Sequence, residues 1–470
     1  MKPSRPIALS AVLCFVGILA LSSVTDACLL ADRLRVIAPQ LTEQEVMAMA
    51  HGNMKREVVP YDFEAAEACA NGMADIFPCR NVDLVGFLRL SDIGGGNGND
   101  LWGWTDKLSG KEYALVGRTN GTAFVDISDP ENPLYLGNLP THAGQTSTWR
   151  DIKVYQNRAY IVADQVSSHG MQVFDLTQLR SVTDPPVTFT ATDRYTGFNR
   201  AHNVAINEET GFAYAVGSET CAGGLHMIDL KNPDGPTFAG CFQADGYTHD
   251  VQCVNYIGPH VAYQGKELCF ASNEDTLTIV DVSDKSTPVM VSRVEYLQNG
   301  EFGYTHQGWL TEDHRYFIHD DELDELGQGH NTRTYTWDVT DLENPAVSGF
   351  YDAAAPSVDH NQYIKGDYTY QANYTRGLRI LRITDASTGR LTEMGYFDTF
   401  PESEGNSFSG AWSTYPFFDS GVVLVSDISR GLFILRANMD DFVFFDDFES
   451  GDLTTWSTND GGSTNEGGTP

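Results

Sequence analysis

The chain has 470 residues, 41% hydrophobic and 20% charged, so it can bury a sizeable core and is not disordered as a whole. Asp and Glu number 64 against 30 Lys and Arg, which gives a formal net charge of −34 at pH 7. Nucleic acids and anionic membrane surfaces bind clustered cations, so this charge excludes both as expected partners.

Residues 1–27 have the plan of a secretory signal peptide. Two cations precede an apolar run over residues 7–21, and small residues then lead to an expected cleavage after Ala27. The run is short for a transmembrane helix, and no later stretch reaches about 18 apolar residues. Lipidation of Cys28 is an alternative, although Asp26 fits a lipoprotein signal badly. We expect a secreted, extracellular or cell-surface protein, with the periplasm as the alternative and no transmembrane segment after the signal.

The eight cysteines indicate disulfides rather than a metal or redox motif, because none has a Cys-x-x-Cys spacing. One lies inside the signal, and Cys28 has no close partner. The other six form close pairs that favour an oxidising compartment. These pairs are Cys69 with Cys79, Cys221 with Cys241, and Cys253 with Cys269.

The regions outside the central part of the chain differ in character. Residues 28–80 are expected to form a short helical and disulfide-bonded segment, with helix-like patterns over 41–50 and 62–70. Residues 439–470 are acidic and rich in Gly, Ser and Thr, so we expect a disordered tail.

A six-residue motif, usually ending in Asp, returns seven times at intervals of 44 to 57 residues. Four short strands and their turns occupy about that length, as in one propeller blade. The motifs are Gly121–Asp126, Gly170–Asp175, Gly224–Asp229, Thr276–Asp281, Arg333–Asp338, Gly377–Arg382 and Gly431–Arg436.

Counting strands predicts how the ring closes. The seventh unit has no fourth strand, whereas residues 82–90 have the fourth-strand pattern and no blade of their own. Donating this strand to the last blade would hide two exposed edges. The sequence therefore predicts an all-β fold, a monomeric seven-bladed β-propeller over residues 81–438, closed by an N-terminal strand.

Several longer motifs resemble the choice-of-anchor B family, over roughly Cys69 to Arg436. They are residues 71–83, 103–106, 114–118 and 304–312, together with the LVIVD-type repeat at Leu277–Asp281. The resemblance implies an exported bacterial β-propeller, held at or beyond the cell surface by C-terminal anchors. It implies no established activity and no catalytic residues.

One histidine occupies the same position at the start of the inner strand in four consecutive units: His202, His249, His306 and His360. Equivalent positions of inner strands lie on one ring at one mouth of the channel. Imidazoles there would suit Zn, Cu or Fe, with Asp151 and Asp250 as further ligands or orienting groups. We expect these histidines to brace neighbouring blades through hydrogen bonds, with a metal site and contact with another ligand as the two alternatives.

The most acidic stretch of the propeller covers residues 319–330. Calcium binds several carboxylate oxygens together, but the spacing lacks the register of a calcium loop. We therefore interpret the stretch as a solvated loop, with a calcium site as the alternative.

Five aromatic residues lie near inner-strand starts and either stack on a sugar or peptide or fill the packing between blades. They are Trp102, Trp104, Tyr304, Trp309 and Trp412.

The sequence has no Gly-x-Ser-x-Gly elbow, His-Glu-x-x-His motif or Gly-rich phosphate loop. We therefore expect a non-enzymatic extracellular binding or surface-interaction protein, whose partner is an extracellular protein, peptide or glycan. The alternative is a metal-dependent enzyme, an oxidoreductase or hydrolase, that uses the histidines at the channel.

Overall fold

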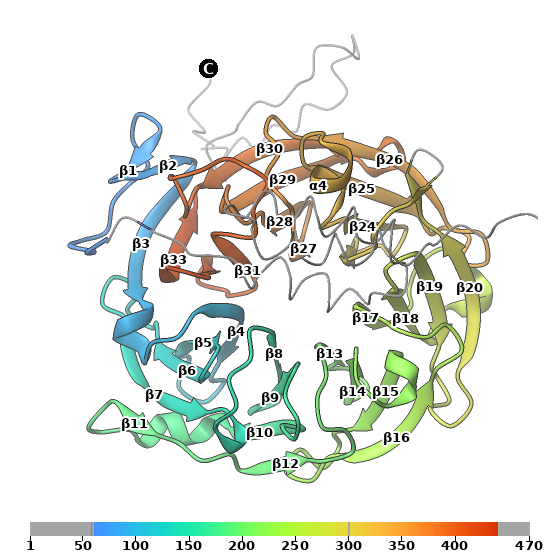
Figure 1. Ribbon diagram of the computed structural model, residues 1–470, viewed down its shortest axis with the longest axis horizontal. Coiled ribbons are helices and arrows are strands. Elements are labelled where there is room, and N and C mark those ends of the chain that lie inside the picture. Colours follow the sequence, from blue (N-terminus) through green and yellow to red (C-terminus); the bar gives the residue numbers. More distant parts are fainter. Residues whose placement is uncertain (1–57, 59–60, 299–300, 440–470) are drawn as a thin grey trace, which may run out of the picture.

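The computed structural model describes residue 58 and residues 61–298 and 301–439. Seven blades, each built on four antiparallel strands, are arranged around a central channel (Figure 1). The fold is thus the predicted all-β, seven-bladed β-propeller. The predicted signal peptide with Cys28, most of the expected helical segment and the expected tail after residue 439 lie outside the described residues.

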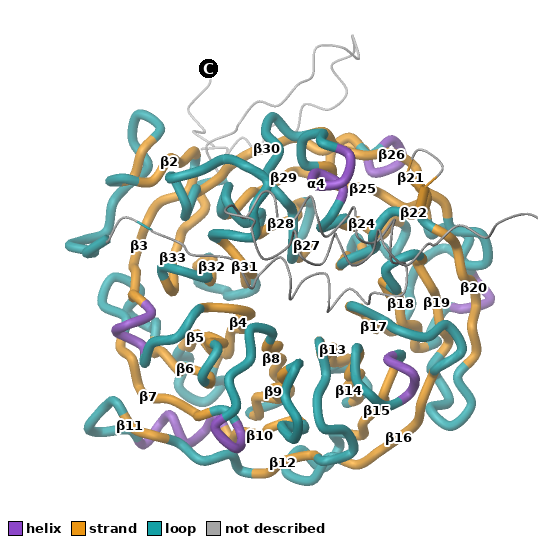
Figure 2. The backbone as a smooth tube through the Cα atoms, in the orientation of Figure 1, coloured by secondary structure: helices purple, strands orange, loops and turns teal. Residues whose placement is uncertain are grey.

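Each blade has four strands, from the channel outward (Figure 2). The inner strands are β4 (Gly98–Thr105), β8 (Arg150–Tyr155), β13 (Asn203–Asn207), β17 (Asp250–Asn255), β23 (Gln307–Leu310), β27 (Gln362–Lys365) and β31 (Ala411–Tyr415). The second strands are β5 (Glu112–Arg118), β9 (Arg158–Ala163), β14 (Phe212–Val216), β18 (Glu267–Ser272), β24 (Tyr316–Asp320), β28 (Tyr368–Ala372) and β32 (Val422–Asp427).

The third strands carry the repeated motif and the fourth strands form the rim. The third strands are β6 (Gly121–Asp126), β10 (Met171–Asp175), β15 (Leu225–Asp229), β19 (Thr276–Asp281), β25 (Arg333–Asp338), β29 (Leu378–Asp385) and β33 (Gly431–Ala437). The fourth strands are β7 (Leu134–Pro140), β12 (Asp193–Tyr195), β16 (Thr237–Phe242), β20 (Val289–Glu295), β26 (Ala346–Asp352), β30 (Arg390–Phe397) and β3 (Val82–Arg89). Minor elements are β1 (Met73–Ala74), β2 (Phe77–Arg80), β11 (Val187–Thr188), β21 (Leu297–Gln298), β22 (Glu301–Phe302) and α4 (Asp324–Gln328).

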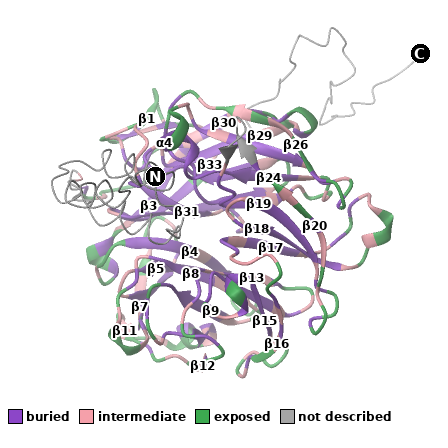
Figure 3. Ribbon diagram, turned by 45° about the vertical axis from the view of Figure 1, so that its right-hand side comes forward, coloured by how far each residue is buried: buried purple, intermediate pink, exposed green. Residues whose placement is uncertain are grey.

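The core lies between neighbouring blades. Phe124 of the first blade stacks on Phe174 of the second, with ring centroids 4.5 Å apart. Phe270 and Phe317 form a similar pair between the fourth and fifth blades, at 5.9 Å. Figure 3 shows that the middle strands are mostly buried, while exposed residues gather at the turns. Because both faces of a blade are buried, these strands read as apolar runs in the sequence.

The ring closes as predicted, because β3 pairs antiparallel with β33 and becomes the outer strand of the seventh blade. The register places Leu84 opposite Leu435 and Phe87 opposite Phe433. A register shift lies between Leu84 and Gly86, and a Cβ at Gly86 would overlap the carbonyl oxygen of Pro130. The closing strand thus needs a glycine where it meets the first blade.

The prediction of helix-like structure over residues 62–70 is wrong. These residues form no helix, and the main chain of Glu67 exchanges hydrogen bonds of 2.8 and 3.0 Å with Leu84 of the closing strand. Pairing with an existing strand satisfies main-chain groups that a short helix would leave open at its ends. Next to this segment, β2 adds to the outer strand β30 of the sixth blade.

Three disulfides join the cysteines that the spacing pairs: Cys69–Cys79, Cys221–Cys241 and Cys253–Cys269. Such bonds fit an oxidising environment. Among the described residues, no helix has the length and apolar character needed to cross a membrane.

Candidate functional site in the central channel

The four predicted histidines lie side by side at one end of the channel, and we call His202, His249, His306 and His360 the histidine layer. Their ring centroids follow one another at 4.5, 4.3 and 4.6 Å. Each histidine directly precedes its inner strand or stands two residues before it, so the propeller repeat itself places them at one level. Trp412 continues the arc, 5.0 Å from His360.

Main-chain carbonyls orient two of these rings. The Nδ1–H of His249 donates to the carbonyl oxygen of His306 at 3.0 Å, and that of His360 donates to the carbonyl oxygen of Trp412 at 2.5 Å. A carbonyl only accepts, so the proton of each neutral ring is on Nδ1 and the lone pair is on Nε2.

Carboxylates lie beside Nδ1 of the other two rings. Asp320 Oδ1 is 2.7 Å from Nδ1 of His306, and Asp164 Oδ2 is 3.2 Å from Nδ1 of His202. Carboxylates and carbonyls at this ring nitrogen are the usual outer partners of metal-binding histidines.

Glu322, from the turn after β24, brings a carboxylate against the histidine layer. Its Oε2 lies 3.6 Å from Nε2 of His306, and its Oε1 lies 3.6 Å from Nε2 of His360. The hydroxyl of Tyr374 donates to Oε1 at 2.6 Å. Within the described part of the chain, His306, Glu322 and His360 are the one group of three or more ligand-type side chains whose ligand atoms all lie within 4.8 Å of each other.

Burial sets the charge state of these three side chains. It lowers the pKa of His306 well below its usual value and that of His360 to about 3. Burial also raises the pKa of Glu322 to about 8. The imidazoles are therefore neutral at pH 7, the form in which histidine binds metals.

The interpretation of residues 319–330 as a solvated loop is wrong, because residues 319–326 are buried. After β24 ends at Asp320, the chain passes Glu322 and enters α4 at Asp324. Protein donors compensate for part of the buried charge: Asp321 accepts from the main-chain nitrogens of Tyr304 (2.8 Å) and Leu323 (3.1 Å). The acidic stretch is thus buried, with Glu322 against the histidine layer.

The two predicted carboxylates lie one position further along the inner strands. Asp151 accepts from the main-chain nitrogen of Val204 in the next blade at 2.6 Å and pairs with Lys153 at 2.5 Å. Burial lowers the pKa of Lys153, but Asp151 and Asp100 outweigh burial and raise it well above its usual value. Asp250 faces the larger cavity described below, and burial, followed by the charge of Asp151, raises its pKa to about 7. Neither aspartate belongs to the group of three that meets at Glu322.

Below the histidine layer, the channel widens into a cavity of about 480 Å³, which we call the channel cavity. Every inner strand contributes to its lining. The lining includes Trp102, Lys153, Ala205, Asp250, Gln307, Trp309, Tyr363 and Tyr415, with Phe417 beyond the end of β31.

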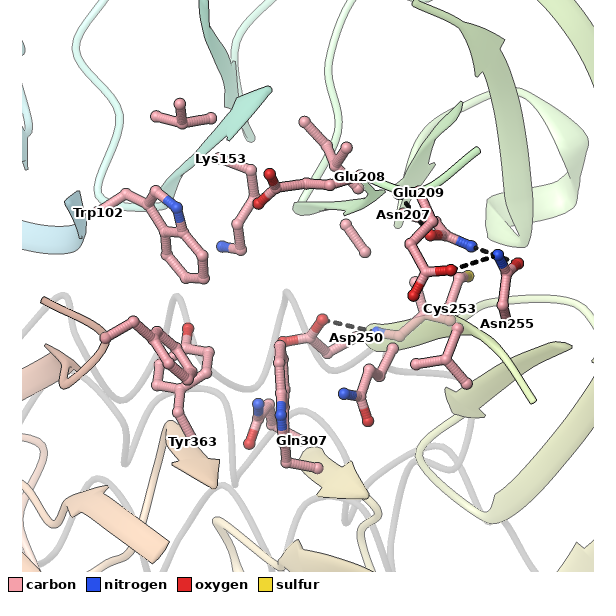
Figure 4. Close-up of a pocket in the computed structure, with 18 of the residues that line it drawn as sticks. Trp102, Lys153, Asn207, Glu208, Glu209, Asp250, Cys253, Asn255, Gln307 and Tyr363 are labelled. Atoms are coloured by element: carbon pink, nitrogen blue, oxygen red, sulfur yellow. Dashed lines mark hydrogen bonds between the residues drawn. The ribbon is translucent and has the colours of Figure 1, made fainter. Parts of the chain in front are cut away.

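Aromatic rings form one wall of the channel cavity. Tyr363 packs edge-on against Trp102 at 5.5 Å and against Trp309 at 5.1 Å, and Phe417 joins them. The ammonium group of Lys153 lies over the Trp102 ring, 4.6 Å from its centroid. Figure 4 shows Trp102 and Tyr363 on one side and the ammonium group of Lys153 between them and the acidic side.

Carboxylates and amides form the opposite wall, where Figure 4 places Glu208, Glu209, Asn207 and Asn255. The Asn255 amide donates to Glu209 at 2.8 Å, and the Asn207 amide donates to Asn255 at 3.3 Å. This wall thus offers several hydrogen-bonding groups, held in place by one another.

The predicted aromatic residues divide between the two alternatives. Trp104, Tyr304 and Trp412 are buried and belong to the packing, whereas Trp102 and Trp309 are half-buried and line the channel cavity. Sequence reasoning missed Lys153, Glu208 and Tyr363. Their position on or just after predicted inner strands could have indicated that they face the channel.

The fold and this channel define a seven-bladed β-propeller with two distinct levels of polar residues. The LVIVD repeat family matches residues 107–141 and 260–295, which hold the second to fourth strands of the first and fourth blades. The chain is therefore a β-propeller that carries LVIVD repeats. None of the curated proteins matches it.

Solved structures with a similar fold have low sequence identity to this chain. A protein from Lactobacillus plantarum is 15% identical, covers 70% of this chain and 88% of its own, and has a TM-score of 0.45. The Cps50 β-propeller domain of Myceliophteria thermophila is 12% identical, with coverages of 76% and 99% and a TM-score of 0.47. A periplasmic gluconolactonase of Pseudomonas aeruginosa is 10% identical, with coverages of 65% and 85% and a TM-score of 0.45.

Proposed function

We propose that this chain is an exported binding protein that takes a neutral saccharide into the channel cavity. The signal-peptide pattern of residues 1–27 and the three disulfides support export. The volume of about 480 Å³ is in the range of small-molecule sites, about 300–1,000 Å³.

The observation that carries the proposal is the pairing of an aromatic wall with a wall of carboxylates and amides. Aromatic faces pack against the C–H faces of sugar rings, while carboxylates and amides hydrogen-bond to hydroxyl groups. An organic cation is the other ligand that aromatic rings and acids would suit. Lys153 already lies over Trp102, so a second cation there would be repelled, and an uncharged ligand fits better.

Calorimetric titration with a panel of neutral mono- and disaccharides tests this function. We expect at least one sugar to bind the wild-type chain and to lose about 10-fold or more in affinity in W309A, because the variant removes apolar contact area with the sugar that contributes about 25 cal/mol per Å². The matched control is F238A, which removes an exposed aromatic ring on the outer strand β16. Absence of binding to every sugar, or equal losses in both variants, would contradict the proposal.

A metal-dependent enzyme, an oxidoreductase or hydrolase, is the second candidate. The close approach of the side chains of His306, Glu322 and His360 favours this class. These side chains lie next to the channel cavity, because Gln307, the residue after His306, lines it. Elemental analysis of protein purified from its native compartment, without chelators, tests the requirement for a metal. Protein with no transition metal and no gain in metal content after incubation with metal salts would exclude this class.

A further inference from the structure

We propose that His306, Glu322 and His360 bind one divalent transition-metal ion at the end of the channel. The site does not depend on the saccharide proposal, because none of its three side chains lines the channel cavity.

The distances between the ligand atoms suit an ion. Two ligand atoms about 2.1 Å from a tetrahedral metal lie about 3.4 Å apart. Each Nε2 atom is 3.6 Å from an oxygen of Glu322, which is too long for a hydrogen bond and close to this spacing. Small side-chain movements would complete the coordination.

The outer contacts already orient the ligands. His360 is held through its Nδ1–H by the carbonyl of Trp412, so its Nε2 lone pair is directed toward Glu322. Asp320 lies at Nδ1 of His306, and Tyr374 holds Oε1 of Glu322. Metal sites in proteins have this arrangement of ligand and outer partner.

Burial gives a second, independent argument. Glu322 and His306 are each about 1% exposed, and a buried carboxylate is costly unless cations or donors surround it. No lysine or arginine in the described residues forms an ion pair with Glu322. The basic side chains beside it are those of His306 and His360. A metal ion would supply a positive charge and so stabilise the ionised form of this carboxylate in its buried position.

The donor set selects the class of metal. Two imidazoles and one carboxylate suit Zn²⁺, Fe²⁺, Co²⁺ or Mn²⁺, whereas Ca²⁺ and Mg²⁺ take oxygen ligands. Three protein ligands leave at least one coordination position for water or another ligand.

The proposed site has a different set of ligands from a ring of four histidines. Glu322 is a ligand here, while His202, at the far end of the histidine layer, is not. Replacing these two residues therefore separates the two arrangements.

Cobalt(II) titrated into the metal-free full chain, followed by visible absorption and calorimetry, tests the site. We expect one ion per chain in the wild type and in H202A. We expect H306A and E322Q to lose the cobalt spectrum and to bind at least about 10-fold more weakly. Excess Ca²⁺ should leave the cobalt spectrum unchanged.

The conservative E322Q variant guards against misfolding, because glutamine keeps the acceptor for Tyr374 and nearly the same volume. Thermal melting of each metal-free variant checks that the propeller is folded. A wild type that binds no cobalt would overturn the proposal. So would equal loss in H202A and H306A, or unchanged binding in a folded E322Q variant.

Discussion

His249 donates a hydrogen bond of 3.0 Å from Nδ1 to the main-chain carbonyl of His306, the equivalent residue of the next blade. The contact joins the fourth and fifth blades at the channel, where the inner strands are close together. This hydrogen bond supports the interpretation that the histidines brace neighbouring blades. It uses Nδ1, whereas a metal would bind the lone pair on Nε2.

Replacing His249 with alanine should therefore lower the free energy of unfolding by about 1–3 kcal/mol, because the carbonyl of His306 would lose a buried donor. Urea denaturation measures the change. H142A, at a half-buried histidine outside the channel, is the control and should change stability by no more than about 0.5 kcal/mol. Equal stability of the wild type and H249A would show that this bond does not brace the blades.

The outer partner of His306 should tune the proposed metal site. Asp320 Oδ1 lies 2.7 Å from Nδ1 of His306, so D320N should keep the protein folded and weaken cobalt binding by about 10–100-fold. Competition with a chelator of known affinity gives the constant. An unchanged affinity in D320N would mean that Asp320 does not orient the ligand.

Closure of the ring should be sensitive to a single methyl group. A Cβ at Gly86 would overlap the main-chain carbonyl of Pro130, and the main chain of Gly86 is held by the pairing of β3 with β33. We expect G86A to lose several kcal/mol of stability or to fail to fold.

The matched control for closure is G405A, where an added Cβ would come no closer than 3.4 Å to another side chain. Its melting temperature should stay near that of the wild type. Similar melting of G86A and G405A would contradict the tight fit of the closing strand.

Stability should fall in mild acid through His226, a buried residue of β15. Its Nε2 lies 2.7 Å from the Tyr195 hydroxyl, and burial lowers its pKa to about 4. Between pH 6.5 and about 4 the unfolded chain binds this proton and the folded chain does not, so acid favours unfolding. The stability of the folded chain is unaffected by this group above about pH 6.5, and the loss should reach about 3 kcal/mol by pH 4.

Comparing the pH dependence of unfolding in the wild type and H226Q isolates this residue, since glutamine does not titrate. The two curves should differ in slope between pH 6.5 and 4 and run parallel above pH 7. Parallel curves over the whole range would show that His226 titrates normally in the folded state.

Much of the architecture could be predicted from the sequence because a propeller repeats local structure. The repeated motif forms the third strand of each blade, such as β6 and β10, and it recurs once per blade length of sequence. Most strands pair with the strands next to them in the chain. Closure by residues 82–90 followed from counting strands. The three cysteine pairs were close in sequence, and the recurrence of histidine before successive inner strands predicted one level of the channel.

The contents of the channel depended on the tertiary structure. Glu322 belongs to a turn that was interpreted as a solvated acidic loop. The pairing of β23 with β24 places it beside His306 of the same blade, and the packing of the next blade brings His360 against it. The aromatic wall likewise joins Trp102 of the first blade to Trp309 and Tyr363 of the fifth and sixth. The alternation of residues along a strand predicts which side chains face the channel. The number and tilt of the blades determine which of these side chains come into contact across it, and no local segment of the sequence encodes that arrangement.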